Sequence, residues 1–297
     1  MEKGYVIGMG EVLWDLLPEG PQLGGAPANF AYHISQFGLP GRIVSAVGND
    51  AAGDRLLDEL GRRGVDGAIE RVGYPTGTVE VTLDAAGIPR YDIREGAAWD
   101  NIPFTPRIEE LARATRAVCF GSLAQRDAAS RTTIERFLDA VPRDEGRYRI
   151  FDINLRQQFY AEPTIRRSLE RCDILKINDE ELEVLVRMLA LPGDGVEAPC
   201  RALVERYGLR VAILTCGARG SYVFTPEETS YLSTPKVEVA DTVGAGDSFT
   251  AAFTAALLRG KTIGAAHRLA VEVSAWVCTR HGAMPRLPEE LLRRAAE

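Results

Sequence analysis

The sequence is poor in cysteine, and the spacing of the cysteines it has suits neither a metal site nor a disulfide framework. The five, Cys119, Cys172, Cys200, Cys216 and Cys278, are scattered, odd in number and never form a C-x-x-C pair. Structural zinc sites and disulfide-rich folds depend on such pairs. The pattern argues against both and is typical of a reducing compartment, so we expect a cytoplasmic protein.

Long apolar runs and a strong excess of charge are also missing. The first residues, MEKGYVIGMGE, lack the apolar core of a secretory signal, and the most apolar helical stretch, 248–258, is much shorter than the roughly 20 residues of a membrane span. The chain has 35 Lys and Arg against 42 Asp and Glu, a net charge of −7, with no long run of either sign. We therefore expect no membrane partner and no nucleic-acid partner.

What the chain does have is a series of short apolar runs separated by helical patterns. Its 297 residues, 45% of them hydrophobic, can bury a large core as one domain spanning 1–297. The alternation predicts βαβ units and an α/β fold with a mainly parallel central sheet flanked by helices. The predicted strands lie at 5–8, 43–47, 117–120, 149–153, 174–177 and 211–215. The predicted helices lie at 28–37, 54–63, 131–140, 179–189, 198–207, 247–258 and 265–279.

Two segments, 11–24 and about 75–100, break this pattern. They contain strand and turn signals, including the alternating run TVEVTL, and no helix between the runs. They predict a small antiparallel flap, which we interpret as a β lid on the main domain because the two segments are not contiguous.

The segment with the clearest chemistry is DTVGAGDSF at 241–249, which opens an apolar helical run. The N–H groups of Gly244, Ala245 and Gly246 can converge at the positive end of that helix and form an anion hole. Asp247 lies beside it, where a carboxylate is costly unless it has a task such as deprotonating a hydroxyl. Taken alone, the segment suits an Asp that stabilises its own helix equally well.

This segment closely resembles the C-terminal signature of the ribokinase-like, or PfkB, family of carbohydrate kinases. The resemblance implies that Asp247 is the catalytic base and that the N–H groups of Gly244, Ala245 and Gly246 stabilise the transferred phosphoryl group. It also implies ATP and Mg²⁺ as cofactors, and a mainly parallel sheet flanked by helices with a β lid over the sugar. The similarity extends from residue 10 to about residue 288.

A second match is GGAPANFA at 24–31, which is similar to the family's N-terminal signature. Gly24 and Gly25 permit close approach of the backbone to a ligand, and Asn29 offers a donor and an acceptor to a sugar diol. In isolation a Gly-Gly-Asn cluster also forms a tight turn with an Asn cap. Asp15 matches the family's early sugar-binding aspartate, although a lone Asp is usually a surface residue.

Two further segments match the nucleotide side of the family's site. Asn178 and Glu181 follow an apolar strand and correspond to the Asn-x-x-Glu that organises Mg²⁺ and its waters, a role suited to hard oxygen ligands. As a plain pattern they also form an acidic helix start. Thr215, Gly217 and Gly220 resemble the family's nucleotide-phosphate loop at the end of a strand, where open α/β sheets bind ligands.

Two arginines are candidates for substrate contacts. Arg156, in DINLRQQFY, matches a segment of fructokinase-like members in which the Arg lies near the sugar or the phosphates. Arg94, in the predicted lid, is a candidate for selecting the sugar. Trp99 is a further candidate there, although a Trp at a lid more often serves packing.

The C-terminal segment VCTRHGAMP at 277–285 resembles the family's tail, which binds a potassium-like ion through backbone carbonyls and the first Asp of the signature. The corresponding residues are Asp241, Val243, Val277, Arg280 and Gly282. One departure counts against this site. Where ribokinases offer a serine to the ion, this chain has Arg286.

Together these matches imply a sugar kinase that uses ATP, with fructose as the leading substrate because three segments look most similar to bacterial fructokinases. Ribokinase, 2-keto-3-deoxygluconate kinase and nucleoside kinase activities remain open alternatives, as does a non-catalytic sugar sensor. An oxidoreductase is less consistent with the sequence, since Leu13 breaks the dinucleotide-binding glycine pattern that begins at Gly8. The resemblance also suggests a homodimer formed through the lid.

Overall fold

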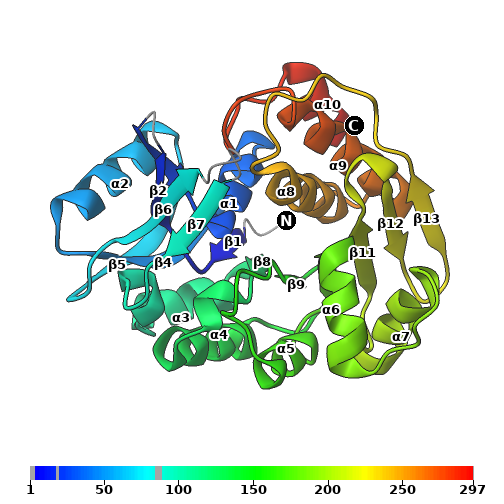
Figure 1. The fold of residues 1–297 in the computed structure, drawn as a ribbon, viewed down its shortest axis with the longest axis horizontal. Coiled ribbons are helices and arrows are strands. Elements are labelled where there is room, and N and C mark those ends of the chain that lie inside the picture. Colours follow the sequence, from blue (N-terminus) through cyan, green and yellow to red (C-terminus); the bar gives the residue numbers. More distant parts are fainter. Residues whose placement is uncertain (1–3, 18–19, 84–88, 297) are drawn as a thin grey trace.

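A nine-stranded sheet runs through the centre of the molecule (Figure 1). The computed structural model describes residues 4–17, 20–83 and 89–296. The strand order is β13-β12-β11-β10-β9-β8-β1-β4-β5, and neighbours from β11 to β5 are parallel. The strands are β1 (Tyr5–Met9), β4 (Gly41–Gly48), β5 (Asp66–Val72), β8 (Thr115–Phe120), β9 (Tyr148–Asp152), β10 (Ile174–Asn178), β11 (Val211–Thr215), β12 (Ser221–Phe224) and β13 (Thr229–Leu232). The predicted α/β class with a mainly parallel sheet is confirmed.

Helices cover both faces of this sheet, as the apolar strands require. In Figure 1, α3 to α7 lie along one side and α8 to α10 along the other, and two large apolar clusters fill the layers between them. The α-helices are α1 (Ala26–Gln36), α2 (Ala51–Arg62), α3 (Pro106–Arg113), α4 (Ala128–Ala140), α5 (Glu162–Leu169), α6 (Asp179–Leu189), α7 (Glu197–Tyr207), α8 (Ala245–Leu258), α9 (Ile263–Val277) and α10 (Glu289–Ala296). Within the described ranges, no helix combines the length and the apolar character needed to cross a bilayer.

A second sheet forms the predicted lid, with the order β3-β2-β6-β7. Its strands are β2 (Leu13–Leu17), β3 (Gly20–Gly24), β6 (Gly77–Leu83) and β7 (Pro89–Ile93). The prediction of an antiparallel flap is wrong in one detail, because β2 and β6 pair in parallel. They are joined through the main sheet and not by a hairpin, and sequence patterns do not report such long-range pairing. Residues 18–19 and 84–88 of the predicted lid lie outside the described residues.

The sequence patterns missed several short elements. Helices α3, α5 and α10 are each eight residues long. Such short helices give a weak periodic signal, although Thr105 and Pro106 at the start of α3 are typical N-terminal residues of a helix. Strands β12 and β13 form an antiparallel hairpin at one edge of the sheet. The longer predicted helices agree with the structure to within a few residues at each end, as expected for frayed boundaries.

The packing predicts a large cost for truncating the core between α4 and the sheet. Phe137 of α4 is fully buried. We expect Phe137→Ala to lower the free energy of unfolding by about 3–5 kcal/mol, because the change removes a buried ring and leaves a cavity. Urea denaturation followed by circular dichroism measures the loss. The control Tyr74→Ala truncates an exposed ring, and equal losses for the two variants would contradict the packing described here.

Candidate active site

Two helices that are far apart in sequence meet at Asp247. The side-chain nitrogen Nδ2 of Asn29, in α1, donates a hydrogen bond of 2.7 Å to Oδ2 of Asp247, in the first turn of α8. Asn29 is buried. The oxygen Oδ1 of its side-chain amide has no hydrogen-bond partner among the described residues. The structure therefore brings together Asn29 and Asp247, which the sequence assigned to the sugar and to catalysis.

The start of α8 is open to an anion. Gly244 caps the helix with a left-handed backbone, at φ 77°, and no side chain caps its N–H groups. A Cβ atom at Gly244 would lie 2.7 Å from atoms of Ala283, so the chain needs glycine there for space as well as for conformation. The N–H of Ala245 donates to the Thr242 carbonyl over 3.3 Å. No side chain caps the first-turn N–H groups, including that of Gly246, so the helix start can bind a phosphoryl group.

A buried ion pair that the sequence analysis missed lies beneath this helix end. Lys176 of β10 and Asp152 of β9 pair across the sheet, with 3.0 Å between Nζ and Oδ1. Thr250 of α8 donates to the other oxygen of Asp152 over 2.9 Å. A Cβ atom at Gly246 would lie 2.9 Å from the Lys176 ammonium. The usable signal was a lysine in the middle of the apolar strand ILKI, since lysine is almost never fully buried without a partner.

The site raises the proton affinity of Asp247. Burial, together with the nearby Asp152 carboxylate, raises the pKa of its carboxyl to about 6 against the lowering effects of Asn29, Lys176 and Arg156. A carboxyl of this pKa is largely ionised at neutral pH, yet it is a stronger base than an ordinary aspartate.

Asp15 lies in β2 of the lid, and burial raises its pKa to about 6 against the lowering effect of Arg156. The two glycines of the N-terminal signature make room for this arrangement. A Cβ atom at Gly24 would overlap the carboxylate of Asp15, and one at Gly25, which has φ 113°, would overlap the carbonyl oxygen of Glu11. The two glycines therefore allow the backbone to lie against two acidic residues, the carboxylate of Asp15 and the backbone carbonyl of Glu11.

Arg156 lies on the loop that follows β9. Its side chain is exposed, and its charge lowers the pKa of Asp15, Asp247 and Glu11, so it lies near these three acids. Asn154 and Gln157 on either side of it have left-handed backbone conformations, with φ 45° and 48°. Non-glycine residues adopt such conformations at a cost, and they cluster at functional sites.

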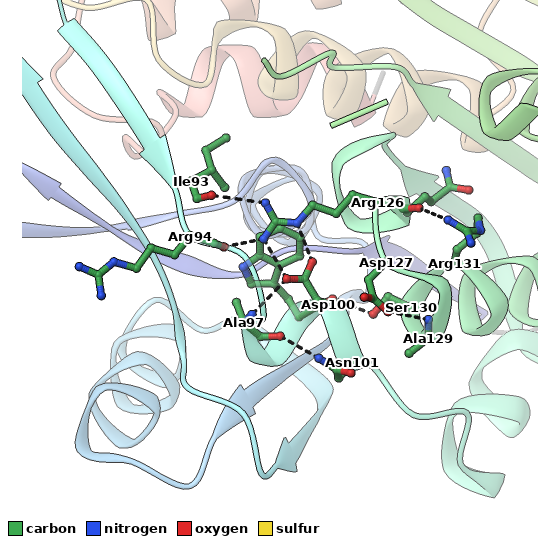
Figure 2. A network of polar contacts seen from close by, with 12 residues as sticks. Ile93, Arg94, Ala97, Asp100, Asn101, Arg126, Asp127, Ala129, Ser130 and Arg131 are labelled. Atoms are coloured by element: carbon green, nitrogen blue, oxygen red, sulfur yellow. Dashed lines mark hydrogen bonds and ion pairs between the residues drawn. The ribbon is translucent and has the colours of Figure 1, made fainter. Parts of the chain in front are cut away.

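Arg94 lies at the end of the lid, where its exposed side chain pairs with Glu80. Its carbonyl oxygen accepts a hydrogen bond of 2.5 Å from Arg126. Arg126 also donates two hydrogen bonds of 2.8 Å to the carboxylate of Asp100 (Figure 2). The Arg126 guanidinium lies 4.1 Å from the ring centre of Trp99. Trp99 is 1% exposed, which rules against a substrate contact and shows that it packs the base of the lid.

Asn178 and Glu181 form the N-terminal capping box of α6. The Glu181 carboxylate accepts hydrogen bonds from the N–H groups of Asn178 at 2.8 Å and Leu155 at 2.9 Å. Glu181 is 6% exposed, and its contact with a metal-bound water stays a prediction. Among the residues that the structure describes, no group of three His, Cys, Asp or Glu side chains is arranged to hold a metal ion.

The predicted nucleotide loop lies beside Asn178. Thr215, at the end of β11, is the register partner of Asn178 in β10, and its hydroxyl donates to the carbonyl of Ile177 over 3.3 Å. Gly217 and Gly220 lie in the turn that follows, closed by a 2.8 Å bond from the Cys216 N–H to the Gly220 carbonyl. These positions stay predictions for nucleotide binding.

Asp241 joins the loop before α8 to the C-terminal segment. Its carboxylate accepts hydrogen bonds from the N–H groups of Val243 at 3.0 Å and Gly282 at 2.9 Å. Arg280 donates from its backbone to Val277 over 3.0 Å. The structure thus places Asp241, Val243 and Gly282 together, while cation binding by these residues stays a prediction.

A known protein family matches most of this chain. The family model described as "pfkB family carbohydrate kinase" matches residues 21–290. The chain belongs to the pfkB family of carbohydrate kinases. This pfkB kinase is 28% identical to the ATP-dependent 6-phosphofructokinase of Thermoanaerobacterium thermosaccharolyticum, over 97% of this chain and 92% of that protein. It is 27% identical to fructokinase-1 of Zea mays, over 97% of this chain and 96% of that protein.

Solved structures of other kinases share the fold. A sugar kinase of Pyrococcus horikoshii, solved in complex with ATP, aligns with 97% of this pfkB kinase and 98% of its own chain, with 26% identity and a TM-score of 0.79. A fructokinase of Vibrio cholerae, solved with fructose, ADP and potassium, aligns with 100% of this chain and 99% of its own, with 24% identity and a TM-score of 0.82. The fold is therefore ribokinase-like, as the sequence predicted.

The raised pKa of Asp15 predicts that this residue costs stability at alkaline pH. A folded-state pKa near 6, against about 4 in the unfolded chain, means that the folded protein loses stability as pH rises through this interval. We expect Asp15→Asn to raise the melting temperature at pH 8 and to have little effect at pH 4.5, measured by differential scanning fluorimetry.

The exposed Asp58 on α2 provides the control. Asp58→Asn should leave the melting temperature nearly unchanged at both values of pH. A melting-temperature difference for Asp15→Asn that is the same at pH 4.5 and pH 8 would contradict the burial of the Asp15 charge.

Proposed function

We propose that this kinase transfers the γ-phosphoryl group of ATP to a primary hydroxyl of a sugar, with D-fructose converted to fructose 6-phosphate as the leading reaction. The observation that supports it most is the position of Asp247, a carboxylate with a raised pKa at the uncapped start of α8. A base and an anion site are thereby adjacent, which is what attack of a hydroxyl on a phosphoryl group needs.

In this mechanism Asp247 receives the proton of the sugar hydroxyl as its oxygen attacks the γ-phosphorus in line. Asn29 orients the base through its 2.7 Å hydrogen bond, while Asp15 accepts hydrogen bonds from other sugar hydroxyls. The N–H groups at the start of α8 stabilise the negative charge of the transferred group. Because phosphoryl transfer depends mainly on positioning and charge stabilisation, these groups should contribute as much as the base.

The nucleotide would lie along the ends of β10 and β11, against Asn178, Thr215, Gly217 and Gly220. Magnesium, bound to its phosphates, would neutralise their charge, and Glu181 would hold one of its waters. Magnesium usually keeps several waters and relies on substrate phosphates for the rest of its coordination, so a single carboxylate suffices on the protein side. Arg156, on the loop that follows β9, would add positive charge near the phosphates.

Fructose leads among the sugars because GEVLWDLLP, LGGAPANFAYH and DINLRQQFY resemble fructokinase segments, and a plant fructokinase is among the relatives. Ribose, 2-keto-3-deoxygluconate and nucleosides are the competing substrates, since few lid side chains select the sugar. Fructose 6-phosphate joins them because one relative is a 6-phosphofructokinase. Release of ADP by the purified protein, measured with Mg-ATP and each compound in turn, decides between them.

Removal of the base should abolish most of the activity. We expect Asp247→Asn to lower kcat by at least about 10²-fold, because one general base commonly contributes 10²–10⁴-fold, with an unchanged circular dichroism spectrum. The steady-state rate of ADP release with the preferred sugar measures the loss.

Asp54 also lies in the first turn of a helix, α2, away from the site. The control Asp54→Asn makes the same change there and should keep full activity. An Asp247→Asn variant that retains most of its kcat would remove Asp247 from the role of base.

The pH dependence follows from the pKa of Asp247. A base must be ionised to accept a proton, so kcat/KM should rise as pH increases through about 6 and should fall away below it. Initial rates between pH 5 and pH 8, with the ATP and sugar kept below their KM values, measure this limb. A rate that is flat down to pH 5 would contradict the raised pKa or the assigned base.

A further inference from the structure

Glu11 is a buried acid that the proposed mechanism does not use. It lies in the turn between β1 and β2 and is 3% exposed. Its oxygen Oε2 is buried and has no hydrogen-bond partner among the described residues. An unpartnered buried carboxylate oxygen is costly, and native structures keep such groups chiefly where they serve a function.

This carboxylate shares a small cavity with the catalytic base. The cavity has a volume of about 10 Å³, and its polar side chains are those of Glu11, Asp152, Asn154, Asp247 and Thr250. This volume is at the lower limit for one water molecule, and the polar lining supplies the two to four partners that a buried water needs. Because Glu11 and Asp247 both line this cavity, a water placed in it would be shared by the two residues.

The fold fixes Glu11 in this position. The backbone N–H of Ala26, at the start of α1, donates to its carboxylate, and Gly25 packs directly on its carbonyl oxygen. Glu11 thus lies at the N-terminus of α1 as Asp247 lies at the N-terminus of α8, and Asn29 joins the two helices. The hydrogen bond from the Ala26 N–H explains why a carboxylate lies at this helix end. It does not explain why Oε2 is buried without a partner.

We propose that Glu11 is the second proton acceptor of the reaction, reached from Asp247 through one water in the shared cavity. The inference rests on the proposed role of Asp247 as base. The sugar O–H bond breaks as its oxygen bonds to the γ-phosphorus, and the bond from that phosphorus to the ADP oxygen breaks. The proton passes to Asp247, the water takes it and gives one of its own to Glu11, and Glu11 releases it to solvent after the products leave.

Several charged and titratable groups set the proton affinity of Glu11. Burial, together with the Asp247 carboxylate, raises its pKa to about 7 against the lowering effects of its own backbone N–H, the Arg156 guanidinium and the Ala26 N–H. Asp152 also lines the cavity, but Lys176 neutralises it, and the remaining titratable group is the buried thiol of Cys119 on β8. Because Glu11 and Asp247 repel each other when both are ionised, the charge of each raises the pKa of the other.

The test is a plot of the logarithm of kcat against pH, and the quantity measured is its slope on the acidic side, where the rate falls. The wild-type enzyme needs both carboxylates ionised, so the slope should exceed one below about pH 6, approaching two. In Glu11→Gln the slope should fall to one and the midpoint should move to lower pH, because the repelling charge is gone. The maximal rate should also fall by at least about 10²-fold, within the range of a proton-transfer group, because the enzyme needs the second acceptor.

Glu11→Gln keeps an oxygen that can accept the Ala26 N–H, and Asp127→Asn makes the same carboxylate-to-amide change at the N-cap of α4 as a control. If Glu11→Gln keeps the wild-type pH profile and only lowers the melting temperature, Glu11 merely caps α1 and the relay is overturned. Should this variant not fold, a wild-type limb with a slope of one overturns it equally. A wild-type protein that phosphorylates no sugar would refute the proposed function itself, so the two failures are distinguishable.

Discussion

The hydrogen bond between Asn29 and Asp247 joins the N-terminal and C-terminal parts of the chain, 218 residues apart in sequence. It holds the first turns of α1 and α8 against each other, so that the positive ends of both helices meet at one point. Acidic groups gather there because helix N-termini stabilise negative charge. The same geometry places Asn29, a predicted sugar residue, and the predicted phosphoryl cradle next to one carboxylate.

Electrostatic balance explains much of what surrounds this point. Glu11, Asp15 and Asp247 are buried wholly or in part and have raised pKa values, while Lys176 and Arg156 supply opposing charge. The Lys176–Asp152 pair is buried in the sheet and fully paired, so it supports the floor of the site without adding net charge. The carboxylates that remain without a cationic partner are the ones that can exchange protons.

Sequence patterns predicted the parallel sheet and the longer helices, because apolar periodicity is a local property. That segments 24–31 and 241–249 belong to one site was implied by the family resemblance and not by local pattern. They did not predict the parallel pairing of β2 with β6 or the burial of Trp99 under Arg126, which arise from contacts between distant segments. Glu11 and Lys176 were missed for a related reason. A single charged residue in or beside an apolar strand shows its role only when its neighbours from other strands are known.

The account rests on the claim that Asp247 and the start of α8 form one phosphoryl-transfer site. A crystal structure with fructose, Mg-ADP and aluminium fluoride, which mimics the transferred phosphoryl group, tests it most directly. The account predicts the fluoride against the N–H groups of Gly244, Ala245 and Gly246, with the 6-hydroxyl of fructose between it and Asp247. Fluoride bound elsewhere, or a sugar with no hydroxyl within hydrogen-bond distance of Asp247, would contradict it.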